Sequence, residues 1–515
     1  MLHWTGGRKA TGTFPANKRA RDVVAELPQG NAVAAVLAIT EALEAIRNVD
    51  ALTLDERYDE IQVLDIAALA HTRALLREYL TTSRQKKMRE GELWNSAYGY
   101  WSELATAYVE CVQRYAEDSQ GVRSFRLKVP VALARALRAL RRQLQWSRIR
   151  YAAPSADLWM NLAGLYGFVG GSNVDEGVRI YPDETTTFRL EFLKAMVQSA
   201  LSSENLQPSE QDIATQVVSH FAPLFVLSKT DAAGCTHWFD LRYPEAPART
   251  TREPRPDGDV LYFGAGPAVE ALEKTTAVLN ATRELPPGLM LEGKSDPAFV
   301  RSILEHVQDD WSGKTQARQH ERQKIKARVT VVPGFKGILR TLEFVVNDSL
   351  DFTGQPNAES WVVDDVSEGG YGAILPALAG DWVEVGSLVA VEGEVLRHWR
   401  VGVVRRVLGI EGDQQRVGVQ LLGTHASLVR IRREEQRQAD LGASQRVPLD
   451  FAILLSADAA SQTEVEVIVR SGSFTQVDNV YMESGNQHIV LRPKAVVERN
   501  AACERVLFSV VKIEG

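Results

Sequence analysis

The sequence of 515 residues has little cysteine and no long apolar run. Its three cysteines, Cys111, Cys235 and Cys503, lie far apart, which argues against a disulfide framework and is typical of the reducing cytoplasm. No apolar run approaches the roughly 18 residues needed to span a bilayer, and the first residues lack the apolar core of a signal peptide. We therefore expect a cytoplasmic protein without a transmembrane segment.

An excess of positive charge is also absent. The chain carries 59 lysines and arginines against 66 acidic residues, which gives a formal net charge of −7. We therefore expect no bulk attraction to a nucleic-acid polymer. Hydrophobic residues make up 45% of the chain, which is ordinary for a globular protein. The length is sufficient for about three or four domains.

The motifs of common enzyme classes are missing too. The sequence contains no G-x-S-x-G and no H-E-x-x-H. Asp364 and Asp365 are adjacent, and neighbouring residues of a strand point to opposite faces, so we expect no two-carboxylate mechanism. Cys235 and His237 have no second pair at ligand spacing, so we expect no metal site. We predict a protein that is not an enzyme and has no cofactor.

Apolar residues recur at three- and four-residue spacing between residue 31 and about residue 227. Asn31 is a suitable N-cap for one helix, and Thr53, followed three residues later by Glu56, opens another with a sequence like a capping box. We predict an N-terminal all-α bundle over residues 29–227, preceded by a flexible arm at residues 1–28. The bundle is the candidate module for binding a protein partner.

One predicted helix of this bundle is unusually basic. Residues 119–156 include no acidic side chain, and four leucines form one apolar face at helical spacing. Arginines crowd the other positions: Arg135, Arg138, Arg141, Arg142, Arg148 and Arg150. Such a face either binds an acidic partner, an anionic membrane surface or nucleic acid, or pairs with acidic residues of the first two helices.

Residues 228–317 read as a small mixed α/β region. Gly264 and Gly266 form a Gly-x-Gly turn between a strand-like run and a helix, which is part of the dinucleotide-binding motif. The third glycine is missing and no repeated βαβ pattern follows, so we predict a simple strand-to-helix turn. A helix predicted from Asp296 to about Lys326 leads into the next region.

Further along the chain, a short polar turn separates two strand-like apolar runs. It combines Asp365, Ser367, Gly369 and Gly370. A carboxylate accepts two N–H groups at once, a hydroxyl donates and accepts, and glycine allows a close approach to the backbone. These groups suit the Watson–Crick edge of a guanine. The alternative is a hairpin turn stabilised by its own Asp and Ser side chains, without a ligand.

The neighbours of this turn occur in a recognisable order. A basic segment at 322–328 runs into the strand-like residues 329–332, then come the Asp-x-Ser-x-x-Gly turn and the glycine-centred runs VGVVRRV and VGVQLL at 401–407 and 417–422. Over roughly residues 320–435 this order resembles the PilZ domain, a small six-stranded β-barrel that in bacteria reads the second messenger cyclic di-GMP. The resemblance implies a PilZ-like antiparallel barrel at residues 318–440.

The resemblance also implies which residues bind the nucleotide. In the family, an Arg-x-x-x-Arg pair before the first strand holds phosphates and guanine edges, and the Asp-x-Ser-x-x-Gly turn holds a guanine. The turn motif matches without departure. Arg328 abuts its strand correctly, but Lys324 stands four residues earlier in place of arginine. Lysine meets a phosphate as a point charge and does not form the planar fork to guanine, so either binding is weaker or Arg322 substitutes.

The candidate ligand set therefore comprises Arg322, Lys324, Arg328, Asp365, Ser367, Gly369 and Gly370. After the barrel, residues 427–440 are charged and read as helical. Residues 441–515 contain closely spaced strand-like runs and predict a second small β-barrel or sandwich. The expected fold class is α+β multidomain, with an N-terminal all-α bundle, a central six-stranded barrel and a C-terminal β domain.

Three functional hypotheses follow from this organisation. The first is a cyclic di-GMP receptor that transmits ligand occupancy to the helical module and through it to an unknown protein partner. The second, favoured by Lys324, is a ligand-free PilZ-like scaffold that mediates protein–protein interaction. The third is an undetected enzyme within residues 230–300. The sequence does not choose among motility, pili, exopolysaccharide and secretion as the output.

Overall fold

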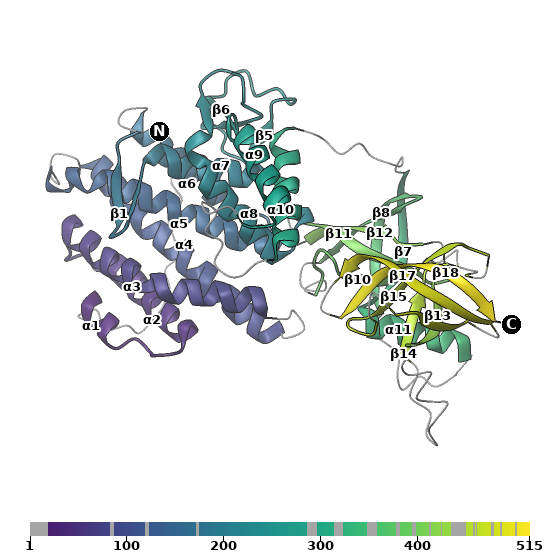
Figure 1. Ribbon diagram of the computed structural model, residues 1–515. Coiled ribbons are helices and arrows are strands. Elements are labelled where there is room, and N and C mark those ends of the chain that lie inside the picture. Colours follow the sequence, from purple (N-terminus) through teal and green to yellow (C-terminus); the bar gives the residue numbers. More distant parts are fainter. Residues whose placement is uncertain are drawn as a thin grey trace. The chain divides into compact units, whose positions relative to one another are not determined.

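The computed structural model describes residues 19–82, 87–118, 123–170, 175–285, 296–313, 323–347, 358–376, 382–393, 398–410, 414–423, 425–433, 450–456, 459, 461–474, 478–484, 487–499 and 502–514. The chain divides into two compact units, Met1–Gln316 and Ala317–Gly515, which are described separately (Figure 1). Within the described residues, no helix combines the length and the apolar character that crossing a bilayer requires.

The first unit is built mainly of α-helices. These are α1 Ala20–Ala25, α2 Ala32–Arg47, α3 Leu54–Thr81, α4 Lys87–Glu117, α5 Val129–Ile149, α6 Ala156–Val169, α7 Phe188–Ala200, α8 Pro208–Phe221, α9 Ala268–Thr282 and α10 Pro297–Trp311. The predicted start signals are confirmed. The side chain of Asn31 accepts from the backbone N–H of Ala34 at 3.1 Å, and Thr53 and Glu56 form a capping box.

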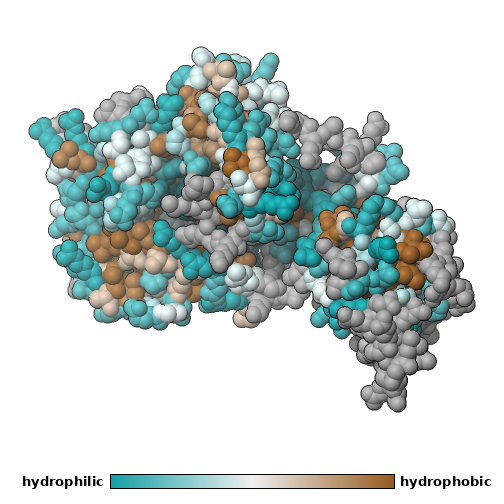
Figure 2. Space-filling view, in the orientation of Figure 1, coloured by the Kyte–Doolittle hydropathy of each residue, from teal (hydrophilic) through white to brown (hydrophobic). Residues whose placement is uncertain are grey.

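Helix α5 is buried along most of its length and contacts α4, α6, α7 and α8. A hairpin of β1 Val178–Tyr181 and β2 Glu184–Thr186 also packs on it. Large apolar side chains that stay exposed in this unit are few and scattered; Leu37 and Ile66 are examples. Figure 2 shows hydrophobic areas over the helices among mainly hydrophilic side chains.

The basic helix predicted within residues 119–156 does not present its arginines to solvent. Arg135, Arg138 and Arg141 are 4%, 8% and 3% exposed. Arg135 Nη1 lies 3.0 Å from Asp65 Oδ2 on α3, and Arg138 Nη2 lies 3.1 Å from Glu191 Oε1 on α7. Of the two alternatives for this helix, pairing with acidic residues therefore holds for Arg135 and Arg138. The acidic partners come partly from the second predicted helix and partly from later elements.

A four-stranded antiparallel sheet completes the first unit. Its strands are β3 Val226–Ser228, β4 His237–Asp240, β5 Ala248–Arg249 and β6 Val260–Gly264, in the order β3-β6-β4-β5. The turn after β6 has a packing reason for its first glycine. A Cβ at Gly264 would lie 2.2 Å from the carbonyl oxygen of Gly234. Glycine is therefore needed here because the backbone of Gly234 comes too close for a side chain.

The second unit opens with a closed six-stranded antiparallel barrel, which confirms the predicted architecture. Its strands are β7 Gln323–Pro333, β8 Glu359–Ser367, β9 Gly370–Pro376, β10 Leu388–Gly393, β11 Arg400–Ile410 and β12 Gln414–Leu421, in the order β10-β11-β12-β9-β8-β7. Helix α11 Phe335–Asn347 lies between β7 and β8 in the chain. The helix predicted from Asp296 ends earlier than expected, since residues 323–326 already belong to β7.

A second closed six-stranded barrel follows. It confirms the C-terminal β domain, which the sequence predicted as a small barrel or sandwich. It contains β13 Ser427–Arg433, β14 Asp450–Leu454, β15 Glu464–Arg470, β16 Val480–Ser484, β17 Gln487–Arg499 and β18 Cys503–Glu514, in the order β13-β14-β15-β18-β17-β16. The helix expected at residues 427–440 was wrong for residues 427–433, because these residues pair with both β14 and β16. The rest of that expected helix lies outside the described residues.

The two barrels share a hydrophobic core with α11. Its buried members are Val332, Phe335, Ile338, Leu342, Leu388, Ala390 and Val401 from the first barrel and α11, and Ile453, Leu455, Ile468 and Cys503 from the second barrel. Because both barrels contribute side chains to one cluster, each barrel covers apolar surface of the other.

Candidate ligand-binding face of the first barrel

Five neighbouring strands of the first barrel form one outer surface, which we call the candidate face. Pairing across the strands places Lys324 opposite Asp365, Asp365 opposite Gly372, Gly372 opposite Gly418, and Gly418 opposite Arg406. Directly paired residues of antiparallel strands share a face. These five residues therefore form a row that has a cation at each end, a carboxylate beside one of them, and two glycines between.

A second row runs parallel to the first on the same face. It contains Arg328, Val362, Ile374, Arg416 and Leu408, each paired with the next. The two rows are about 7 Å apart on β9 and β12, because two residues of a strand span that distance. Val362 and Leu408 are 39% and 40% exposed, so this row offers exposed apolar side chains beside two exposed arginines.

The opposite side of the same strands fills the barrel. Val329, Trp361, Val363, Ala373 and Val417 alternate with the residues of the two rows and are at most 7% exposed. Because successive side chains of a strand point to opposite sides, these buried positions establish that the candidate face looks outward.

Three of the five strands are irregular at the level of the first row. The pairing register shifts between Lys324 and Ala327 on β7, between Val363 and Asp365 on β8, and between Val404 and Arg406 on β11. A β-bulge inserts an extra residue and re-aims the side chains beside it, and bulges concentrate near functional sites. Here the bulges bring charged side chains of three strands onto one surface.

The bulge in β8 turns two adjacent acids toward one arginine. Arg416 Nη2 lies 2.8 Å from Asp364 Oδ2 and 2.7 Å from Asp365 Oδ2. The expectation that these neighbours point to opposite faces was wrong, because it assumed a regular strand. Asp365 is 6% exposed, whereas the side chain of Arg416 is 46% exposed. The guanidinium thus neutralises a largely buried carboxylate and still reaches solvent.

The two glycines of the first row differ in what surrounds them. A Cβ at Gly372 would lie 2.6 Å from Asp365 Oδ2, so this glycine makes room for the carboxylate. A Cβ at Gly418 would meet only the Cβ of Arg406, at 3.4 Å, which is an ordinary contact. The packing around Gly418 therefore does not itself require glycine, and the backbone there is bare although a Cβ would fit.

The predicted polar turn is the two-residue connection between β8 and β9. Ser367 pairs with Gly370, and its Oγ donates to the Gly370 carbonyl at 3.5 Å. Gly369 accepts from the backbone N–H of Leu421 at 2.9 Å. A Cβ at Gly370 would lie 2.1 Å from the carbonyl oxygen of Val419. Packing of β9 on β12 is therefore sufficient to explain glycine at position 370.

The structure brings together part of the predicted ligand set. Lys324 and Asp365 are direct neighbours, and Arg328 lies on the same face in the next row. The end of the β8–β9 hairpin contains Ser367, Gly369 and Gly370. It lies on the side of the first row that is away from the second row. Arg322 lies outside the described residues.

Seven residues of the two rows were not in the predicted set: Val362, Gly372, Ile374, Arg406, Leu408, Arg416 and Gly418. The sequence contains a signal for two of them, since the runs VGVVRRV and VGVQLL include Arg406 and Gly418. Their shared face depends on the cross-strand register and on the bulges, which a single sequence does not specify.

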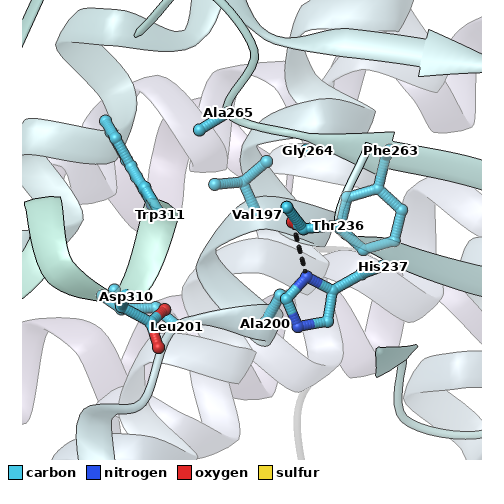
Figure 3. A pocket seen from close by; sticks show the side chains of 10 residues that line it. All are labelled: Val197, Ala200, Leu201, Thr236, His237, Phe263, Gly264, Ala265, Asp310 and Trp311. Carbon is cyan, nitrogen blue, oxygen red and sulfur yellow. Dashed lines mark hydrogen bonds between the residues drawn. The ribbon is translucent and has the colours of Figure 1, made fainter. Parts of the chain in front are cut away.

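The first unit contains a separate small pocket at the sheet and the end of α10 (Figure 3). Burial and the charge of Arg249 lower the pKa of His237 to about 4, so its ring is neutral at pH 7. Asp310 accepts from Ser202 at 2.7 Å and pairs with Arg249 at 3.4 Å. The interior volume is about 10 Å³, which accommodates one water molecule. The described part of the chain shows no group of three or more potential metal ligands.

Comparison with known proteins concerns the first unit. Residues 18–232 match the model of a protein family described as the N-terminal domain of the cyclic-di-GMP receptor FimW. The matched segment includes α1 to α8 and β3, and it ends before both barrels. No curated protein and no solved structure matches the chain.

Proposed function

We propose that the protein is a cyclic di-GMP receptor of the PilZ type and that it binds the nucleotide on the candidate face. The observation that carries the proposal is the pair of parallel rows, in which cations flank a bare backbone strip and an acidic corner on one outward surface. The family description that matches residues 18–232 names the same messenger and supports the proposal independently.

The chemistry of the ligand fits the charges of the face. Cyclic di-GMP is a compact dianion with two guanine bases. Lys324 and Arg328 supply positive charge for the phosphates from β7, and Arg406 approaches the strip from β11. An arginine fork fits the O6 and N7 acceptors of guanine, and a carboxylate accepts from its N1–H and N2–H groups. Asp365 is the acceptor in this proposal, and Gly418 gives the base room against the backbone.

The proposed output is transmission to the helical module. Lys324 and Arg328 lie on β7, which is the first described element after α10 of the first unit. A ligand that engages both residues restrains the start of the second unit. Such a ligand shifts a conformational equilibrium only to the extent that its affinities for the two states differ. The proposal therefore requires β7 to have a second arrangement that binds the nucleotide less well.

Titration calorimetry of the full chain with cyclic di-GMP tests the site. Gly418→Leu fills the strip where the structure has room for a side chain, and it should weaken binding by about tenfold or more, equivalent to about 1.4 kcal/mol. Gln414→Leu is the matched control, because Gln414 is exposed on the same strand but lies in neither row. Absence of binding heat with the wild-type chain, or equal affinity of both variants, rejects the proposal.

A ligand-free scaffold is the second candidate, and one observation favours it. Asp365 is already neutralised by Arg416, so the acid that would hold guanine has an internal partner. Lys324→Arg separates the two candidates. A functional site should bind cyclic di-GMP more tightly with arginine there, because arginine adds a planar fork. A barrel that has lost the ligand gives no binding with either residue.

A further inference from the structure

An ion-pair network joins the two barrels beside the candidate face. Arg405 on β11 donates to both carboxylate oxygens of Glu498 on β17, at 2.7 and 2.9 Å. Its Nε donates to Gln420 Oε1 on β12 at 2.8 Å. Arg505 Nη2 lies 3.5 Å from the same Glu498 carboxylate. Arg405 and Glu498 thus hold each other across the boundary between the barrels. Gln420 also fixes Arg405, and Arg505 also contacts Glu498.

Arg405 occupies a special position in its strand. Val404 pairs with Val419 and Arg406 pairs with Gly418, so Arg405 is the extra residue of the β11 bulge. The extra residue of a bulge has no direct partner on the neighbouring strand, and the bulge sets the direction of the side chains next to it. The fork to Glu498 holds Arg405 toward the second barrel. Its neighbour Arg406 is thereby left on the candidate face.

We propose that Glu498 of the second barrel is a positioning residue for nucleotide binding, because its bidentate contact with Arg405 sets the β11 bulge that aims Arg406 at the strip over Gly418. The second barrel is in this way a structural part of the binding site of the first. The inference rests on the proposed function, since affinity for cyclic di-GMP is its readout.

The exposure of the pair decides which measurement is informative. The side chains of Arg405 and Glu498 are 39% and 27% exposed. Ion pairs that are this open to solvent add little to folding stability, whereas a bidentate arginine–carboxylate contact strongly fixes side-chain geometry. Loss of Glu498 should therefore affect ligand affinity while leaving the melting temperature nearly unchanged.

Glu498→Gln is the principal variant, because it keeps the shape of the side chain and removes its charge. Its affinity for cyclic di-GMP should fall about fivefold relative to the wild-type chain. Glu466→Gln is the matched control. Glu466 belongs to the same network, 3.1 Å from Arg505 Nη1, but among the described residues no ion pair joins it to Arg405. Its variant should bind within about twofold of the wild-type chain.

A double-mutant cycle distinguishes positioning from general loosening. In an Arg406→Ala background, Glu498→Gln should cause almost no additional loss of affinity, because the residue that it positions is gone. Arg405→Lys keeps the charge but cannot form the fork, so it should weaken binding as Glu498→Gln does. Calorimetry and thermal unfolding of the full chain provide the measurements.

Each outcome has a separate meaning. If the wild-type chain does not bind cyclic di-GMP, both the proposed function and this inference fail. If the wild-type chain binds and Glu498→Gln binds equally well, or loses the same factor with and without Arg406, only this inference is overturned. A large fall in melting temperature for Glu498→Gln also overturns it, since the residue would then act through stability.

Discussion

Asp365 and Gly372 are cross-strand partners, and the carboxylate of Asp365 occupies the space that a side chain at position 372 would need. A Cβ at Gly372 would lie 2.6 Å from Asp365 Oδ2 and 2.7 Å from both Oδ1 and Cγ. The same carboxylate contacts Arg416 at 2.7 Å. This fit between a glycine and a carboxylate links the stability of the first barrel to the geometry of the candidate face.

The first prediction concerns these glycines. Gly372→Ala should destabilise the second unit by about 1–3 kcal/mol, because the added methyl group forces the buried carboxylate of Asp365 away from Arg416. Gly418→Ala is the control and should change stability by less than about 1 kcal/mol, since its Cβ meets only an ordinary contact at 3.4 Å. Urea unfolding monitored by tryptophan fluorescence measures both. Equal stability of the two variants would contradict the described packing.

The bulges explain why the sequence predicted the strands of the barrel but not which residues share the candidate face. The strands around residues 329–332, 401–407 and 417–422 were predictable from alternating apolar residues, and the short polar turn after Ser367 from its glycines. Asp364 was misplaced because a bulge breaks the alternation that the prediction assumed. A bulge depends on the register of two strands distant in the sequence, so neither strand reveals it alone.

The buried arginines of α5 illustrate a second limit. The caps at Asn31 and Thr53 were predictable because their contacts are local. The burial of Arg135 depends instead on Asp65, which lies 70 residues earlier in the chain. A helix with one apolar and one basic face has the same local pattern whether its basic face contacts water or distant acids.

The second prediction concerns the pH dependence of stability. Burial of Glu191 alone would raise its pKa, but the charges of Arg138, Lys194 and Arg141 outweigh burial and hold the pKa well below the ordinary 4.5. A lowered carboxylate pKa in the folded state adds stability above pH 4.5, and this stability is lost as the pH falls further. The wild-type melting temperature should therefore fall more steeply below pH 4.5 than that of Glu191→Gln.

At neutral pH, Glu191→Gln should itself cost about 3–5 kcal/mol, because it leaves buried cations without their partner. Glu305→Gln is the control, since Glu305 is 54% exposed and its contact with Arg301 is long, at 3.9 Å. Its effect should be within about 0.5 kcal/mol. Calorimetric melting between pH 3 and 7 compares the three chains, and parallel curves for wild type and Glu191→Gln would disprove the assignment.

The third prediction concerns salt. If Arg328 contacts a phosphate of cyclic di-GMP, the dissociation constant should rise with ionic strength, because ions screen exposed charges. Arg328→Ala should weaken binding and make it less sensitive to salt. Arg470→Ala on the second barrel is the control, since Arg470 is exposed and far from the candidate face in the strand order. Calorimetry at several salt concentrations tests it, and an unchanged salt dependence in Arg328→Ala would exclude the contact.

The fourth prediction concerns thiol reactivity. Cys111 and Cys503 are buried, and Cys235 is half-buried. Burial raises the pKa of the Cys111 thiol to about 12, so its reactive thiolate form is scarce at neutral pH. A colorimetric thiol reagent should label Cys235 first in the folded chain and all three cysteines after denaturation. Cys235→Ser should remove the fast phase. Rapid labelling of a second thiol under native conditions would show that one buried site opens readily.

The hydrophobic cluster shared by the two barrels has a consequence for how this region can be divided. Val401 and Ala390 of the first barrel pack in one core with Ile453 and Ile468 of the second. A truncation between β12 and β13 would leave apolar side chains of both halves facing water, a condition that promotes aggregation. We therefore expect the two barrels to remain together in gene fusions, in the fragments from limited proteolysis and in evolutionary rearrangements of domains.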